Sequence, residues 1–170
     1  MIRYLKSTQS GRSMIEMLGV LAIVGVLSAG GIAGYSMAMQ THKTNTMIER
    51  ISLIAMQTRK LYKGDYTDAD IQDLVDAGKI TDAKNPFGGT LAVSVSGWGN
   101  DTFDVAADGI PAEACVDLLT ADWGPSSTFE GIWFSNSKKY RYKEGTYPIS
   151  TATAISACKE DAALIRVIFR

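Results

Sequence analysis

Apolar residues are concentrated near the N-terminus of this chain. Residues 17–39 contain no charged side chain, and a helix of that length rises about 34 Å, which is enough to cross a bilayer. Beyond residue 39, Met47, Ile51 and Ile54 recur at helical spacing with polar residues between them. We therefore predict a long helix that begins as a membrane segment, continues as an amphipathic half and ends near Lys63.

The remaining residues, 64–170, alternate between short helical and strand-like patterns. Alternation of apolar and polar positions predicts strands, and helical spacing with capping residues predicts short helices. Because strands that are close in sequence favour antiparallel pairing, we expect an antiparallel sheet packed on the long helix, which is an α+β head. The expected strands lie at 91–95, 103–105, 129–134, 140–142 and 164–169, and the expected short helices at 67–78, 112–120 and 151–161.

Composition and charge narrow the range of functions. The chain is 46% hydrophobic and carries 17 basic and 18 acidic residues, so nothing in its charge predicts nucleic-acid binding. A single histidine, His42, argues against a histidine-dependent catalytic triad or an imidazole zinc site. The acids from Asp68 to Asp76 lack the glycine and final glutamate of a calcium loop, and they fit a helix start better. We expect no enzyme activity, metal or cofactor.

Charges around the apolar segment predict its orientation. Arg3, Lys6 and Arg12 precede the segment, so the positive-inside rule places the N-terminus in the cytoplasm and the head outside. There, Cys115 and Cys158 could form one structural disulfide. A cleaved signal peptide is a poorer fit because the apolar run is too long. A plain signal anchor would leave Glu16, an acid at the membrane, without the cation that it needs.

The segment after Gly11, with the sequence RSMIEML followed by a long apolar helix, resembles the prepilin motif of type IV pilins and pseudopilins. In that family a prepilin peptidase cuts after the glycine and methylates the new N-terminal residue. The resemblance implies a leader over residues 1–11 and a mature chain that begins at Arg12, where an apolar residue is usual. It further implies a membrane and filament-core half at 12–39, an amphipathic half at 40–63 and a head at 64–170.

Glu16 matches the family's acid at the fifth position of the mature chain. Such a carboxylate could pair with the freed α-amino group of a neighbouring subunit, so that two costly membrane charges neutralise each other. Gly30 and Gly34 form a GxxxG pattern that would let helices approach closely. The alternative is that these glycines are merely tolerated in a membrane helix.

Features of the head are similar to those of the type IVb pilins, the class of the bundle-forming and toxin-coregulated pili. They are the sequence NPFGG at 85–89, the sequence ACV around Cys115 on an expected helix, and the sequence ACK around Cys158 shortly before the last expected strand. The resemblance implies that the disulfide bounds a variable, exposed loop, 115–158, in which one or two of Trp123, Tyr140 and Tyr147 would face a neighbour. The short leader and head also fit a minor or plasmid-type pilin.

The resulting hypothesis is a structural subunit of a type IVb pilus-like filament, a helical homo-oligomer. The resemblance implies as partners the prepilin peptidase, an inner-membrane platform protein, a cytoplasmic assembly ATPase and an outer-membrane secretin. The chain would lie in the inner membrane before assembly and on the cell surface afterwards. The alternatives are a minor pilin, a type II secretion pseudopilin, or a membrane-anchored hydrolase using carboxylates among Asp101, Asp104 and Asp108.

Overall fold

The computed structural model describes residues 12–125, 127–135, 139–143, 149–159 and 162–170. Within these ranges the side chains of residues 12, 13, 139–143, 162 and 163 are not described. The chain divides into two compact units, one ending at Met39 and the other running from Gln40 to Arg170. We describe each unit by itself.

The long helix α1 runs from Arg12 to Tyr62. In the first unit the side chains described from Met14 onward are exposed, with Leu18 67% and Ile32 70% exposed. The helix contains a stretch with a mean hydropathy of 2.1, long and apolar enough to cross a membrane. It ends where Lys63 and Gly64 adopt positive φ angles of 52° and 100°, near the residue that the sequence predicts. Gly64 adopts this backbone conformation without strain.

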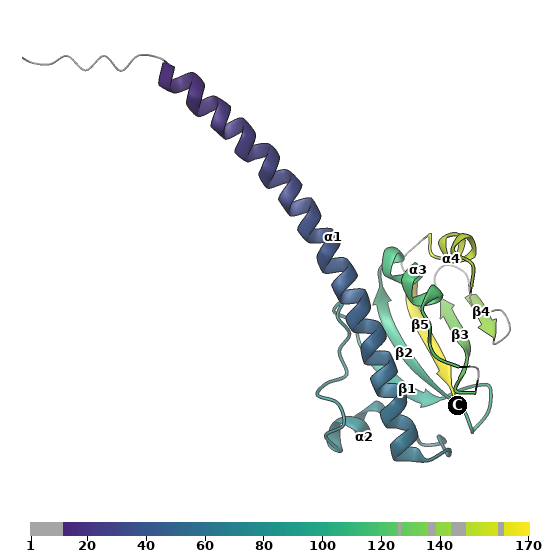
Figure 1. Ribbon diagram of the computed structural model, residues 1–170. Coiled ribbons are helices and arrows are strands. Elements are labelled where there is room, and N and C mark those ends of the chain that lie inside the picture. The colour runs from purple at the N-terminus through teal and green to yellow at the C-terminus, as the bar shows by residue number, and fades with distance from the viewer. Residues whose placement is uncertain (1–11, 126, 136–138, 144–148, 160–161) are drawn as a thin grey trace, which may run out of the picture. The chain divides into compact units, whose positions relative to one another are not determined.

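The head contains a five-stranded sheet in which every pairing is antiparallel, as predicted. Its spatial order is β1-β2-β5-β3-β4, so the last strand lies between β2 and β3 (Figure 1). The sequence predicts a second strand at 103–105, whereas β2 continues to Ile110 and includes Gly109 at a φ of 62°. The strands are β1 Leu91–Val95, β2 Phe103–Ile110, β3 Phe129–Ser135, β4 Lys139–Lys143 and β5 Ala162–Phe169.

Three short helices complete the head: α2 (Ile71–Asp76), α3 (Ala112–Thr120) and α4 (Thr151–Ala157). The helix α2 is shorter than predicted because its N-cap is Asp70, whose side chain accepts a hydrogen bond from the Gln72 amide. Ser150 caps α4 in the same way, and that helix ends at Ala157, with Cys158 as its C-cap, instead of continuing to residue 161. The disulfide between Cys115 and Cys158 joins α3 to the end of α4.

One hydrophobic core lies between the sheet and the helices. Its buried residues include Met47 and Ile51 of α1, Val105 of β2, Val167 of β5 and Leu118 of α3. The predicted α+β architecture, with the long helix packed on an antiparallel sheet, is therefore confirmed.

Trp123 is part of this core. It is 7% exposed, and its indole Nε1 donates a hydrogen bond of 3.0 Å to the Leu118 carbonyl oxygen. Trp123 is therefore not one of the aromatic residues that face a neighbouring subunit, and that prediction now concerns Tyr140 and Tyr147 alone. Tyr147 and the side chain of Tyr140 lie outside the part of the chain that the structure describes.

Candidate assembly site

The exposed half of α1 carries three of the residues predicted to direct assembly: Glu16, Gly30 and Gly34. All three are exposed. A Cβ atom added to either glycine would meet nothing within 4 Å, so the helix surface is open there. Residues four apart lie on the same helix face, one turn from each other, so the two glycines form one shallow notch. The predicted cleavage site, Gly11, and the Arg12 side chain lie outside the described structure.

An exposed apolar helix of this length needs lipid or other helices around it. Removing a Leu or Val side chain from water contributes about 1.5–3 kcal/mol, and α1 presents many such side chains between Met14 and Met39. In lipid, the contacts that hold helices together depend on small residues that allow close approach. This surface can therefore exchange a lipid environment for contacts with like helices.

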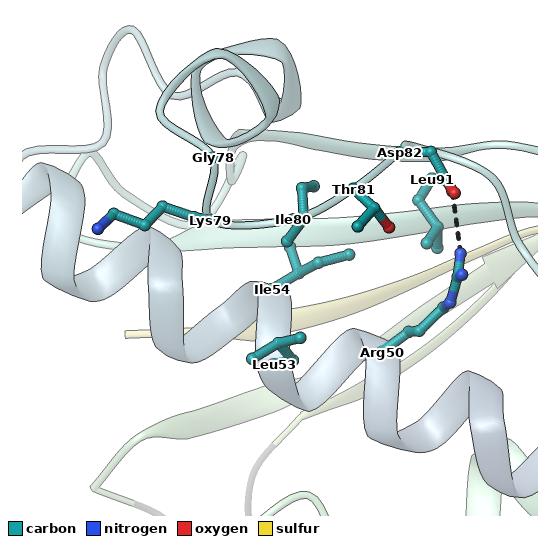
Figure 2. A pocket seen from close by; sticks show the side chains of 9 residues that line it. All are labelled: Arg50, Leu53, Ile54, Gly78, Lys79, Ile80, Thr81, Asp82 and Leu91. Atoms are coloured by element: carbon teal, nitrogen blue, oxygen red, sulfur yellow. Dashed lines mark hydrogen bonds and ion pairs between the residues drawn. The ribbon is translucent and has the colours of Figure 1, made fainter.

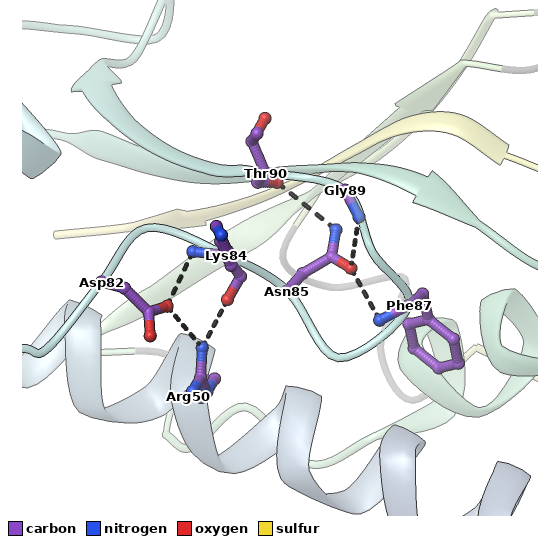
Figure 3. A network of polar contacts seen from close by, with 7 residues as sticks. All are labelled: Arg50, Asp82, Lys84, Asn85, Phe87, Gly89 and Thr90. Atoms are coloured by element: carbon purple, nitrogen blue, oxygen red, sulfur yellow. Dashed lines mark hydrogen bonds and ion pairs between the residues drawn. The ribbon is translucent and has the colours of Figure 1, made fainter.

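In the head, a polar network fixes the segment between α2 and β1 against α1 (Figure 3). The Arg50 guanidinium of α1 donates to Asp82 Oδ1 at 3.0 Å and to the Lys84 carbonyl oxygen. Asp82 Oδ1 also accepts the Lys84 amide at 2.9 Å. These contacts hold the pKa of the Asp82 carboxyl below its ordinary value, first through the Lys84 amide and then through Arg50.

The next part of this segment is the NPFGG sequence, which is held by Asn85. The Asn85 side chain accepts the amides of Phe87 and Gly89 at 2.8 and 3.2 Å and donates to the Asp108 carbonyl oxygen at 2.7 Å. The Asp108 carboxylate in turn accepts the Thr90 amide and hydroxyl. The motif is thus a turn that attaches the start of β1 to β2.

A groove opens beside this network (Figure 2). Its volume is about 450 Å³, and it lies between Leu53 and Ile54 of α1 and the segment 78–82. Leu53 is 42% exposed, although its neighbours Ile51 and Ile54 are buried. The sequence analysis missed this groove. The sequence feature that could have revealed the groove is Leu53, an apolar residue that lies outside the buried stripe of α1.

The carboxylates considered for a hydrolase do not share a site. Asp101 pairs with Arg170, Asp104 with Arg166, and Asp108 binds Thr90. Within the described residues, no group of three or more histidine, cysteine or acidic side chains could hold a metal ion. Each carboxylate thus has a structural partner of its own.

Known proteins resemble this chain in sequence and fold. A family model described as PilS N terminal matches residues 41–169. The toxin coregulated pilin of Vibrio cholerae is 29% identical over 132 residues, 68% of this chain and 59% of that pilin. The major structural subunit of bundle-forming pilus from Escherichia coli O127:H6 is 27% identical over an alignment of 187 residues, which covers 96% of this chain and 95% of that subunit.

The fold also matches a crystal structure of a type IV pilin from the Vibrio cholerae El Tor biotype. The TM-score is 0.57 at 16% identity, and the match covers 76% of this chain and 99% of that one. The resemblance stated from the sequence is confirmed. The chain belongs to the PilS N-terminal family, within the type IVb pilins.

Proposed function

We propose that this protein is the structural subunit of a type IVb pilus and that it polymerises with copies of itself through residues 12–39. The observation that carries this proposal is the apolar surface of α1 from Met14 to Met39, which is exposed over its whole length. Relatives named as a pilin and as a major structural pilus subunit support the same function.

Glu16 sets the axial register in this proposal. After cleavage behind Gly11, the α-amino group of Arg12 in one subunit pairs with the Glu16 carboxylate of its neighbour, and each charge satisfies the other in an apolar filament core. The notch at Gly30 and Gly34 allows the helices to approach closely, because it offers no side chain to hold them apart.

The proposal includes the topology and the machinery of assembly. The leader, residues 1–11, stays in the cytoplasm until the prepilin peptidase removes it, residues 12–39 lie in the inner membrane, and the head lies outside. An assembly ATPase, a platform protein and an outer-membrane secretin then bring the subunit to the surface as a pilus. Exposure outside the cytoplasm is consistent with the disulfide between Cys115 and Cys158.

Two measurements on the native host test this proposal. Electron microscopy of sheared surface fractions should show long fibres that contain this chain, and mass spectrometry should find that the chain begins at Arg12. A product that begins downstream of Glu16 would contradict the proposal, because it would lack the charge that sets the register. Short periplasmic assemblies without surface fibres would instead favour a secretion pseudopilin.

A further inference from the structure

Aromatic side chains form a continuous series across one end of the head. Phe103 of β2 and Phe129 of β3 are each paired in register with Phe169 of β5, so strand pairing brings these rings together. The ring centroid of Phe169 lies 5.7 Å from that of Phe103 and 6.4 Å from that of Trp123. Tyr66, between α1 and α2, has its centroid 4.6 Å from that of Phe103. These separations fall in the range in which aromatic rings interact, ~4.5–7 Å.

The series ends at Tyr62, the last residue of α1. Its ring centroid lies 6.5 Å from that of Tyr66. The Tyr62 side chain is half-buried, whereas Tyr66 is 3% exposed and Trp123 is 7% exposed. The series therefore connects a tryptophan in the core with a tyrosine at the surface of the head.

The Tyr62 hydroxyl is bonded to a group that can accept its proton. It donates to the carboxylate of Asp73, an exposed residue of α2, and it accepts the Asp70 amide at 3.0 Å. Burial and the Asp73 contact raise the pKa of the Tyr62 phenol above its ordinary value of 10.0, so the proton is present at neutral pH. A carboxylate ionised at that pH can take this proton if the ring is oxidised. Among the described residues, Tyr62 is the tyrosine whose hydroxyl donates to a carboxylate.

The Trp123 end of the series has no such base. Its indole Nε1 donates to the Leu118 carbonyl oxygen, which accepts a hydrogen bond but is too weak a base to take the proton. A Trp123 ring that loses an electron therefore keeps its proton and stays a radical cation, which is a stronger oxidant than the neutral radical. The Arg59 Cζ atom lies 5.4 Å from the Phe169 centroid and 6.0 Å from that of Phe103, so its charge disfavours a positive charge on these intervening rings.

We propose that this series protects the core by moving an electron vacancy from Trp123 to Tyr62. After a one-electron oxidant, such as the carbonate radical, has taken an electron from Trp123, an electron passes from Tyr62 to Trp123 across the intervening rings. The O–H bond of Tyr62 breaks, and its proton moves to Asp73, which becomes a carboxylic acid. Trp123 is restored, and the neutral Tyr62 radical lies at the surface, where ascorbate can return one electron and one proton.

This proposal goes beyond filament formation and does not depend on it. Laser-flash photolysis of the purified full-length chain in detergent micelles tests it. The double variant Trp98→Phe/Trp133→Phe leaves Trp123 as the one tryptophan of the chain. Light at the red edge of the indole band, which tyrosine does not absorb, ejects an electron from Trp123, and hexaamminecobalt(III) takes up that electron. The absorption of the tryptophan radical should decay while that of a tyrosine radical grows at the same rate.

Further substitutions in this background identify the path. Tyr62→Phe should abolish the growth of the tyrosine radical and prolong the Trp123 radical. Asp73→Asn removes the proton acceptor and should slow the transfer at least about tenfold, whereas Asp73→Glu should retain most of the rate. Tyr35→Phe is the matched control, because Tyr35 is 68% exposed on the apolar half of α1 and is not part of the series. Circular dichroism confirms that each variant is folded.

Three outcomes would overturn the proposal: no tyrosine radical after ionisation of Trp123, an unchanged transfer rate in Tyr62→Phe, or an equal loss in Tyr35→Phe. The unmodified protein provides an independent measurement if a variant fails to fold. After exposure to carbonate radicals and a nitroso spin trap, mass spectrometry should find the trap bound to Tyr62 and Trp123 intact. Oxidised Trp123 beside unmodified Tyr62 would also contradict the proposal.

Discussion

Gly89 stands where the chain turns from the NPFGG sequence into β1, in contact with β2. A Cβ atom built on Gly89 would lie 2.1 Å from Asp108 Oδ1 and 2.6 Å from the Asp108 carbonyl oxygen. The second of these atoms is backbone, so relief requires β1 and β2 to separate. The sequence analysis interpreted these residues as a family signature, but the contact with Asp108 depends on the fold.

Gly89→Ala should destabilise the head by about 1–3 kcal/mol, the usual cost of forcing atoms into a packed site. Denaturant unfolding of the variant would measure the loss. Gly97→Ala is the matched control, because a Cβ at Gly97 meets nothing within 4 Å and its φ is not in the left-handed region. Equal unfolding midpoints for the two variants would contradict this account.

The contact between Asp82 and Arg50 should depend on pH. The pKa of the Asp82 carboxyl is lowered from its ordinary value of 3.8. The stability that the ionised carboxylate contributes is therefore present above about that pH. It is lost as the pH falls through the lower pKa of the folded state.

An NMR titration of the Asp82 side-chain carbon should give a midpoint below 3.8. Arg50→Gln should move this midpoint upward by only part of the shift, because the Lys84 amide is the larger cause. A midpoint at the ordinary value in the unmodified protein would contradict the structure of this network.

Among the elements, α3 and α4 are joined covalently by Cys115 and Cys158, which are 43 residues apart in sequence. By the chain-entropy estimate, closing a loop of this length stabilises the fold by about 4 kcal/mol. Replacing both cysteines with alanine should lower the free energy of unfolding by up to that amount. Reductant should lower the unfolding midpoint of the native head but leave that of the double variant unchanged. A native midpoint insensitive to reductant would contradict this role.

The sequence analysis predicted the existence and type of most elements, but not the order of strands in the sheet. Alternation identifies β1 because Leu91 and Val93 are buried and Ala92 is exposed, and that pattern is local. The position of β5 between β2 and β3 depends on long-range packing, which no local pattern encodes. The start of α2 differs from the prediction for a local reason, since Asp70 caps the helix and not Thr67 or Asp68. The groove beside Leu53 was missed because the residues that line it, from α1 and the segment 78–82, meet only when the head folds.

For the whole molecule, Glu16 provides the decisive test of assembly. Glu16→Gln keeps the size of the side chain and removes its charge, so membrane insertion and head folding should be unchanged. Filaments should be lost or misregistered, because the amine of a neighbour would have no counter-charge. Electron microscopy of sheared fractions would measure this, with Glu49→Gln, the next acid along α1 and exposed, as control. Normal fibres from Glu16→Gln would refute the pairing.

The placement of β5 also bears on how the head is made. The hairpins β1–β2 and β3–β4 are not paired with each other. The strand β5, which is the last of the five to be synthesised, lies between them. Until that strand is synthesised and in place, the edges of β2 and β3 that it covers carry unpaired backbone, which is vulnerable to proteases and to mispairing. The sheet therefore becomes continuous only when β5 pairs with both β2 and β3, so the fold of the head depends on the last of its five strands.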